Sequence, residues 1–143
     1  MSEQDNVRAV EMIFEALNAH DVNRNSDLIA DDFRSDAPGA AGTMTQDQNN
    51  AYIQGFIDAF PDLHFETRHL IAQGDFVVIN WIGSGTHKGG LRTPTGAVIP
   101  PTGKRGVVPG SLTYEFRNGK IVASYSHWDM VTLLAQLGLM PGM

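Results

Sequence analysis

One stretch decides the fold, because in it a predicted strand runs directly into a short helix: Ser126-His127-Trp128-Asp129-Met130-Val131-Thr132-Leu133-Leu134-Ala135-Gln136-Leu137-Gly138. The residues before the junction, 121–127, include apolar and aromatic side chains that are typical of a strand. Beyond it, Leu133, Leu134 and Leu137 recur at helical spacing, and Gly138 favours a helix end. We therefore expect a strand followed by a helix that closes over one end of a sheet.

The carboxylate at this junction is the first candidate for chemistry. Because side chains alternate along a strand, Tyr125, His127 and Asp129 are expected to share one face. In an apolar pocket the pKa of an Asp rises, and it can then act as a proton carrier. At the start of a helix the same Asp is a favoured N-cap. His127 orients Asp129 or binds a substrate carbonyl in the first interpretation, and is an ordinary half-buried side chain in the second.

The first half of the chain is predicted to be mainly helical. An apolar face with helical spacing, from Val7 to Leu17, indicates a helix that ends near residues 18–21, and a shorter helical piece is expected over residues 26–31. Residues 45–48 have the form of a capping box, and the helix that follows ends before Pro61. The expected buried face of this helix contains Tyr52, Ile53, Phe56, Ile57 and Phe60.

The second half changes to strand patterns, over residues 63–71, 76–86, 112–117 and 121–128. Gly74-Asp75 and Asn118-Gly119 are predicted turns, so consecutive strands should pair antiparallel. Residues 88–110 are rich in Gly and Pro and are expected to form a long loop or an irregular hairpin beside a sheet edge. The predicted fold class is α+β, with helices packed on one face of a curved antiparallel sheet, a pocket between the layers, and one domain over residues 1–143.

Composition narrows the function classes. The net charge of −6 without a basic cluster argues against a nucleic-acid partner or an anionic membrane. The N-terminus is polar and no apolar run approaches the length of a membrane span, so we expect neither a secretory signal nor a membrane span. With no cysteine the chain would tolerate a reducing cytoplasm, which is the expected location. The five histidines show no paired metal-ligand spacing, so no metal is expected.

Several aromatic side chains are candidates for lining a ligand pocket: Trp81, Phe56, Phe60 and Tyr52. Large aromatics at such spacings also occur as plain core, and both interpretations are open. His87 shares strand parity with Trp81, so it lies either on the pocket side or at the edge of the loop.

The face of the sheet on which the Glu115 side chain lies depends on the number of residues in the turn that follows it. A two-residue loop pairs Arg117 with Lys120 and leaves Glu115 on the surface. A three-residue loop with a bulge at Gly119 places Thr113 and Glu115 on the Tyr125 face, as pocket residues.

A set of short segments, in this order along the chain, resembles the SnoaL-like polyketide cyclase family, of the nuclear transport factor 2-like superfamily: residues 59–64 (AFPDLH), 85–89 (GTHKG), 101–105 (PTGKR), 118–121 (NGKI) and 129–138 (DMVTLLAQLG). The resemblance covers roughly the whole chain. It implies a cone formed by a bent sheet wrapped around helices, and a homodimer or homotetramer. Cyclases of this family close a ring in an anthracycline precursor by intramolecular aldol condensation of a methyl ester, without a cofactor.

The resemblance also implies roles for individual residues. Asp129 stands seven residues before Gln136, which is the position of the family's catalytic carboxylate, and His127 matches a pocket histidine. Thr113 and Glu115 depart from the family, which has other polar residues there. The resulting hypothesis is a cofactor-independent acid/base cyclase acting on a hydrophobic, polyketide-like carbonyl compound. The alternatives are a non-catalytic small-molecule-binding module of the same fold, or a related isomerase or hydrolase.

Overall fold

The protein was analysed as a computed structural model, which describes residues 2–93 and 96–139. Its centre is a five-stranded sheet in the order β1-β7-β6-β3-β2. The strands are β1 (Ile29–Asp36), β2 (His64–Gln73), β3 (Phe76–Thr86), β6 (Arg105–Arg117) and β7 (Lys120–Trp128). The helices are α1 (Glu3–Asn18), α2 (Gln46–Ala59) and α3 (Met130–Gln136), with a 3-10 turn at Ser26–Leu28. The expected α+β class is confirmed.

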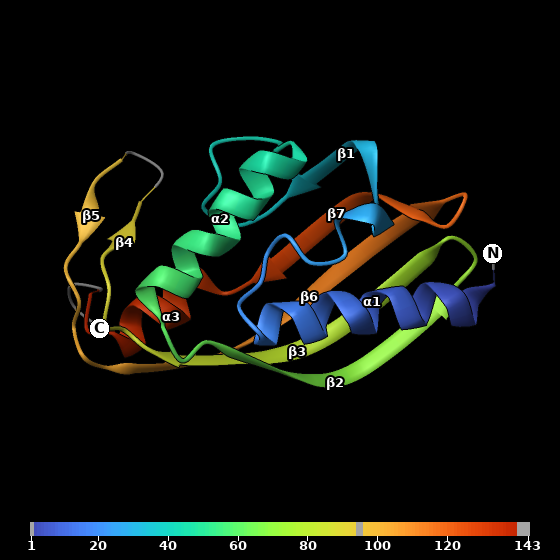
Figure 1. The fold of residues 1–143 in the computed structure, drawn as a ribbon. Helices are drawn as coiled ribbons and strands as arrows, with labels where there is room; N and C mark the ends of the chain where they lie inside the picture. The colour runs from blue at the N-terminus through green and yellow to red at the C-terminus, as the bar shows by residue number, and fades with distance from the viewer. Residues whose placement is uncertain (1, 94–95, 140–143) are drawn as a thin grey trace.

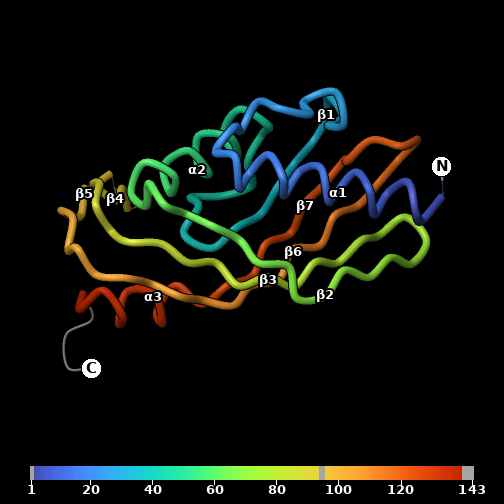
Figure 2. Tube along the Cα trace, turned by 60° about the horizontal axis from the view of Figure 1, so that its bottom comes forward, coloured from blue at the N-terminus to red at the C-terminus, as the bar shows by residue number. Residues whose placement is uncertain are grey.

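The sheet is bent, and two helices cover one of its faces. Figures 1 and 2 show α1 and α2 on the same side of the long strands, with α3 at the end of the sheet far from the N-terminus. We call the helix-covered side the inner face and the opposite side the outer face. The core lies between α1, α2 and the inner face, where Val10, Phe14, Val77, Ile79 and Ile121 are all buried.

Both long helices begin at capping boxes. The Ser2 hydroxyl accepts from the Asp5 backbone N–H, and the Asp5 carboxylate accepts from the Ser2 backbone N–H. Thr45 and Gln48 form the same reciprocal pair at the start of α2, as the sequence predicts. Each box satisfies two backbone groups that an uncapped helix leaves without partners. These caps fix where the two helices that cover the inner face begin.

The expected helical piece over residues 26–31 is wrong beyond its first turn. After Ser26–Leu28 the chain enters β1, which pairs parallel with β7. The sheet is therefore antiparallel at every junction except this one. Phe33 and Ser35 are buried, whereas Arg34 and Asp36 are exposed. This segment carries three Asp and one Arg among its eight residues, so its weak apolar content hid a strand at the sheet edge.

The segment over residues 88–110, expected as a long loop or an irregular hairpin, follows the second alternative but ends earlier than predicted. It contains a small hairpin of β4 (Leu91–Arg92) and β5 (Val98–Ile99), and β6 begins at Arg105. Glycine and proline content suggested a loop here, but Gly106 and Gly110 lie within β6, opposite β3. Their lack of side chains makes room on the inner face, as described below. No helix among the described residues is long and apolar enough to cross a membrane.

Candidate functional site: an aromatic pocket on the inner face

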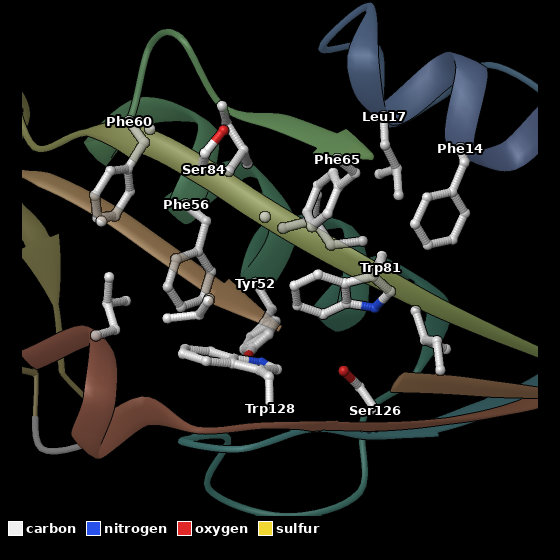
Figure 3. A pocket seen from close by; sticks show the side chains of 18 residues that line it. Phe14, Leu17, Tyr52, Phe56, Phe60, Phe65, Trp81, Ser84, Ser126 and Trp128 are labelled. Carbon is white, nitrogen blue, oxygen red and sulfur yellow. The ribbon is translucent and has the colours of Figure 1, made fainter. Parts of the chain in front are cut away.

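A pocket of about 120 Å³ lies between the two covering helices and the inner face of the sheet. Its walls are almost entirely apolar, and residues from α1, α2, four strands and α3 contribute to them. The lining residues are Phe14, Leu17, Tyr52, Ile53, Phe56, Phe60, Leu63, Phe65, Trp81, Gly83, Ser84, Gly85, Gly106, Val108, Leu112, Ser126, Trp128 and Leu133. A cavity of this size holds a ligand of about one ring, since a cavity near 150 Å³ accepts benzene. Figure 3 shows it from close by.

The aromatic walls contact one another edge to face. Phe56 packs against Tyr52 and Trp128, with ring centroids 5.2 and 5.4 Å apart. On the other side Phe65 and Trp81 are perpendicular at 5.0 Å. Edge-to-face pairs of this kind add stability beyond the area they bury, so they hold the rings in fixed orientations. The pocket is therefore built to accept a flat, apolar group.

A glycine in the middle of the sheet allows the Trp81 ring to lie flat. Trp81, Gly110 and Trp128 stand side by side on adjacent strands, with Gly110 between the two tryptophans. A Cβ built on Gly110 would overlap the six-membered ring of Trp81, and one on Gly83 would come within 2.9 Å of it. The indole thus covers two glycines, and its ring forms part of the pocket surface. Larger residues at these positions would push it away.

Only a few polar groups reach this pocket. The Tyr52 hydroxyl donates to the Pro38 carbonyl at 2.6 Å. Burial raises the pKa of Tyr52 to about 12, although a hydrogen bond with Trp128 lowers it in part. Tyr52 therefore stays protonated at neutral pH. The indole Nε1 of Trp81 is buried without any hydrogen-bond partner among the described residues.

A second compartment of similar volume adjoins the first. It is also about 120 Å³ and shares five lining residues with the aromatic pocket: Leu17, Tyr52, Ile53, Leu112 and Ser126. Its remaining lining is more polar and includes Asp21, Arg24, Asn49 and Asp36. The Asp21 carboxylate accepts from the Arg24 backbone N–H at 3.1 Å, and the Asp36 carboxylate accepts from the Thr43 hydroxyl at 2.9 Å. Both carboxylates are thus engaged locally.

The predicted alternation along β7 is present, but the side chains that face the aromatic pocket are those of the other set. Ser126 and Trp128 line the pocket, while Tyr125, His127 and Asp129 are exposed and belong to the outer face. The register explains this, because Trp128 pairs with Gly110 and Ser126 with Leu112, both inner-face residues. The sequence interpretation expected the side chains with ionisable and hydrogen-bonding groups to face the pocket. In the structure the side chains with more apolar area face it, because burying that area stabilises the fold.

Asp129 caps α3, as its alternative interpretation predicts. Its carboxylate accepts from the Thr132 backbone N–H at 3.0 Å and from the Thr132 hydroxyl at 2.6 Å. These hydrogen bonds, the hydroxyl's first, lower the pKa of Asp129 below that of a free Asp. The apolar pocket that was expected to raise its pKa does not surround it. In this conformation Asp129 is a weaker base than an ordinary carboxylate.

Glu115 and Thr113 also lie outside the pocket, because the hairpin combines a two-residue turn with a bulge, which neither alternative predicted. The turn is the two-residue kind, with Arg117 opposite Lys120 and positive φ at both Asn118 and Gly119. A register shift then follows inside the hairpin, because Phe116 pairs with residue 121 but Glu115 pairs with residue 123. This bulge places Thr113 and Glu115 on the Tyr125 face as expected, but that face is the outer one.

His87 is completely buried but does not line the pocket. Its ring stacks on Phe60 with centroids 5.3 Å apart, and Phe60 is the residue that faces the cavity. Nδ1 accepts from the Thr102 backbone N–H at 3.2 Å and lies 3.1 Å from the Thr102 hydroxyl. Nε2 has no partner among the described residues. Burial lowers the pKa of His87, and a backbone contact at Gly89 opposes this in part.

Of the predicted pocket residues, the structure therefore brings the four aromatic ones into one pocket: Phe56, Trp81, Phe60 and Tyr52. It adds Ser126 and Trp128, which the alternation on β7 could have supplied once the inner side was known. Among residues 2–93 and 96–139, no group of His, Cys, Asp and Glu is placed to hold a metal ion.

The family model for SnoaL-like polyketide cyclases matches residues 7–137, nearly the whole chain. The chain belongs to this family. The resemblance noted in the sequence is therefore confirmed, and so is the fold that it implies. No curated protein matches this chain significantly in sequence.

Solved structures of similar fold support the same placement. IdmH of Streptomyces antibioticus, provisionally assigned as a polyketide cyclase, is 27% identical, with 94% of this chain and 99% of IdmH covered and a TM-score of 0.77. AclR of Streptomyces galilaeus, provisionally assigned as a hydroxylase, is 22% identical, with coverages of 99% and 90% and a TM-score of 0.84. A hypothetical protein of Catenulispora acidiphila with a ketosteroid isomerase-like fold, solved in complex with trimethylamine, is 20% identical, with coverages of 92% and 93% and a TM-score of 0.74. The last two show the fold alone.

Proposed function

We propose that this protein is a cofactor-independent cyclase that closes a ring in a hydrophobic, polyketide-like carbonyl compound. The observation that carries this proposal is the aromatic pocket on the inner face, in a chain of the SnoaL-like family. The pocket supplies a dry, flat surface that holds one end of a flexible chain, and holding the reacting atoms close is a large part of ring closure. The adjoining polar compartment gives a longer substrate room beyond the first ring.

The proton carrier of this proposal is Asp129, on the family's pattern. In the structure its two oxygens are engaged by Thr132, so acid/base work requires the carboxylate to leave the cap. Release from the Thr132 hydroxyl would raise the pKa of Asp129 and make it a stronger base, because that hydrogen bond is the largest cause of its low pKa. His127, next but one along β7 and exposed, is the residue proposed to orient it.

Two variants test this role. Asp129→Asn keeps an N-cap acceptor but removes the base, and Thr132→Val removes only the hydroxyl. With an anthracycline-type polyketide methyl ester as substrate, Asp129→Asn should abolish ring closure, and Thr132→Val should move the acid limb of the pH–rate profile to higher pH. Unchanged turnover in a folded Asp129→Asn protein would exclude Asp129 as the proton carrier.

A binding module without catalysis is the second candidate, and one observation favours it. None of the residues that line the aromatic pocket is an Asp, Glu or His. A pocket of this kind can hold a small carbonyl compound and shield it from water without changing it. No turnover by the wild type, combined with tight binding of the same ester, would support this candidate over the cyclase.

We also propose that the protein acts as a homodimer or homotetramer in the cytoplasm. The family resemblance supports the assembly, and the lack of cysteine fits a reducing compartment. Apolar side chains on the outer face support it further, because Ile71, Phe76, Val107 and Tyr125 are 60%, 46%, 43% and 37% exposed. Sedimentation equilibrium of the wild type and of Ile71→Lys with Tyr125→Glu would test it. A monomeric wild type would contradict the assembly.

A further inference from the structure

One buried polar atom in the aromatic pocket makes no hydrogen bond within the described part of the chain. Trp81 is 6% exposed, its ring lines the pocket, and its Nε1 has no hydrogen-bond partner among the described residues. A buried donor without a partner is unfavourable, and most buried tryptophans find one. The other tryptophan of the pocket differs, since Trp128 Nε1 is not among the buried atoms without a partner and Trp128 interacts with Tyr52. The orphan donor is therefore specific to Trp81.

The Trp81 N–H lies near the boundary between the two compartments. The Trp81 indole extends over Gly110, with its Cζ3 edge near Gly83, and Figure 3 shows its nitrogen on the side of the ring nearer to Ser126. Leu112 and Ser126 belong to the walls of both compartments. Figure 3 shows the Ser126 hydroxyl pointing from β7 toward the Trp81 side of the pocket. The donor thus stands where the aromatic pocket meets the polar compartment, a position we call the neck.

The Ser126 hydroxyl is a second polar group at the neck. Ser126 is partly exposed, and none of the side-chain hydrogen bonds found among residues 2–93 and 96–139 involves it. A hydroxyl can donate as well as accept, whereas an indole N–H can only donate. Both groups can therefore donate to the same ligand atom, and a carbonyl oxygen has the two lone pairs that this requires.

We propose that the Trp81 indole N–H donates a hydrogen bond to a carbonyl oxygen of the ligand at the neck, assisted by Ser126. This inference rests on the proposed function for the ligand class and deepens it. The ligand is an aryl ketone or aryl ester of about one ring in the aromatic pocket, whose oxygen lies at the neck and whose remainder extends into the polar compartment. Nε1 is shielded from solvent in the ligand-free structure, so binding includes a small turn of the indole or of Leu112.

A matched pair of probes tests the hydrogen bond directly. Acetophenone and α-methylstyrene have nearly the same shape, but the ketone oxygen is replaced by a CH₂ group in the second. Trp81→Phe keeps an aromatic ring and removes the N–H. Calorimetric titration should show acetophenone binding about tenfold more weakly to Trp81→Phe than to the wild type, as expected for one lost buried hydrogen bond. Binding of α-methylstyrene should change less than about threefold.

Trp128→Phe is the matched control, because it removes an indole N–H that is not among the buried atoms without a partner. It should change the affinity of both probes by the same factor. Equal losses for both probes in Trp81→Phe would overturn the proposal, since they would show that Trp81 contributes shape alone.

A measurement on the wild type covers the case in which Trp81→Phe does not fold. The indole N–H signal of Trp81 in a ¹⁵N-¹H spectrum should move downfield when acetophenone is added and not when α-methylstyrene is added. The same response to both probes would contradict the hydrogen bond. These binding results do not depend on turnover, so the inference can hold where the cyclase proposal fails, and the reverse.

Discussion

The two faces of β7 differ in what they carry and in what they contact. The outer face has Tyr125, His127 and Asp129, which are exposed, while the inner face has Ser126 and Trp128 against the aromatic pocket. In this conformation a single strand separates these proton-active groups from the ligand surface, so the proposed role of Asp129 requires its carboxylate to leave the α3 cap and reach the inner side. Residues that can exchange protons therefore do not indicate which face of this sheet is buried. The buried face is the one with more apolar side-chain area, because burial of that area stabilises the fold.

Truncating one aromatic residue on each face of the sheet should give the largest difference in stability between the two faces. Trp81→Ala should lower the free energy of unfolding by about 3–5 kcal/mol, since it empties a buried site. Tyr125→Ala, at a side chain 37% exposed, should cost less than about 1 kcal/mol. Urea denaturation measures both. Similar losses for the two variants would show that the outer face is as closely packed as the inner one.

A glycine of the inner face gives the next largest effect. Gly110→Ala should destabilise by about 1–3 kcal/mol and weaken ligand binding, because its Cβ overlaps the Trp81 ring. Gly55 in α2 is the matched control, since a Cβ there meets nothing within 4 Å. Gly55→Ala should stabilise by about 0.4–1 kcal/mol. Thermal unfolding with acetophenone present and absent measures both effects, and an unchanged Gly110→Ala protein would contradict the flat packing of Trp81.

The buried histidine of the inner side predicts a pH dependence. Its pKa is lowered in the folded state, so the unfolded state binds the proton more tightly. Stability should therefore fall as the pH drops below about 6.5, by no more than about 1.4 kcal/mol per pH unit. His87→Gln should remove this loss, whereas His127→Gln should retain it. Urea midpoints between pH 5 and 8 measure the profile, and a flat wild-type profile would contradict the account.

The smallest expected effect is at the Asp129 cap. Thr132→Val removes one exposed side-chain hydrogen bond to Asp129 and keeps the backbone one, so stability should change little. Thermal unfolding at neutral pH measures it. A large loss would show that the cap, and not the inner-face packing, holds α3 in place.

Sequence alone predicted much of the fold, because the helices and long strands carry strong local signals. The capping box at Thr45 and the turn at Asn118-Gly119 both formed as expected. β1 was missed because its acidic residues obscure the alternation at a sheet edge. Its pairing with β7 is also a contact distant in sequence, which no local pattern encodes.

The site was predicted only in part, for a different physical reason. Phe56 and Trp81 are large and apolar, and hydrophobic burial alone brings them inside. The facing of Asp129 and Glu115 depends on register, and a single bulge beside Val122 decides it for Glu115. The role of Gly110 needed the structure, because only the position of the facing Trp81 ring explains why a side chain is excluded there.

The central claim is that the inner face of β7 and its neighbours binds the ligand, and the outer face does not. A ¹⁵N-¹H titration with acetophenone tests it most directly, because both tryptophans of the chain line the pocket. The indole signals of Trp81 and Trp128 and the backbone signal of Ser126 should move together and saturate. The backbone signals of Tyr125 and His127 should stay in place. Saturable shifts at Tyr125 and His127 with unchanged indole signals would contradict it.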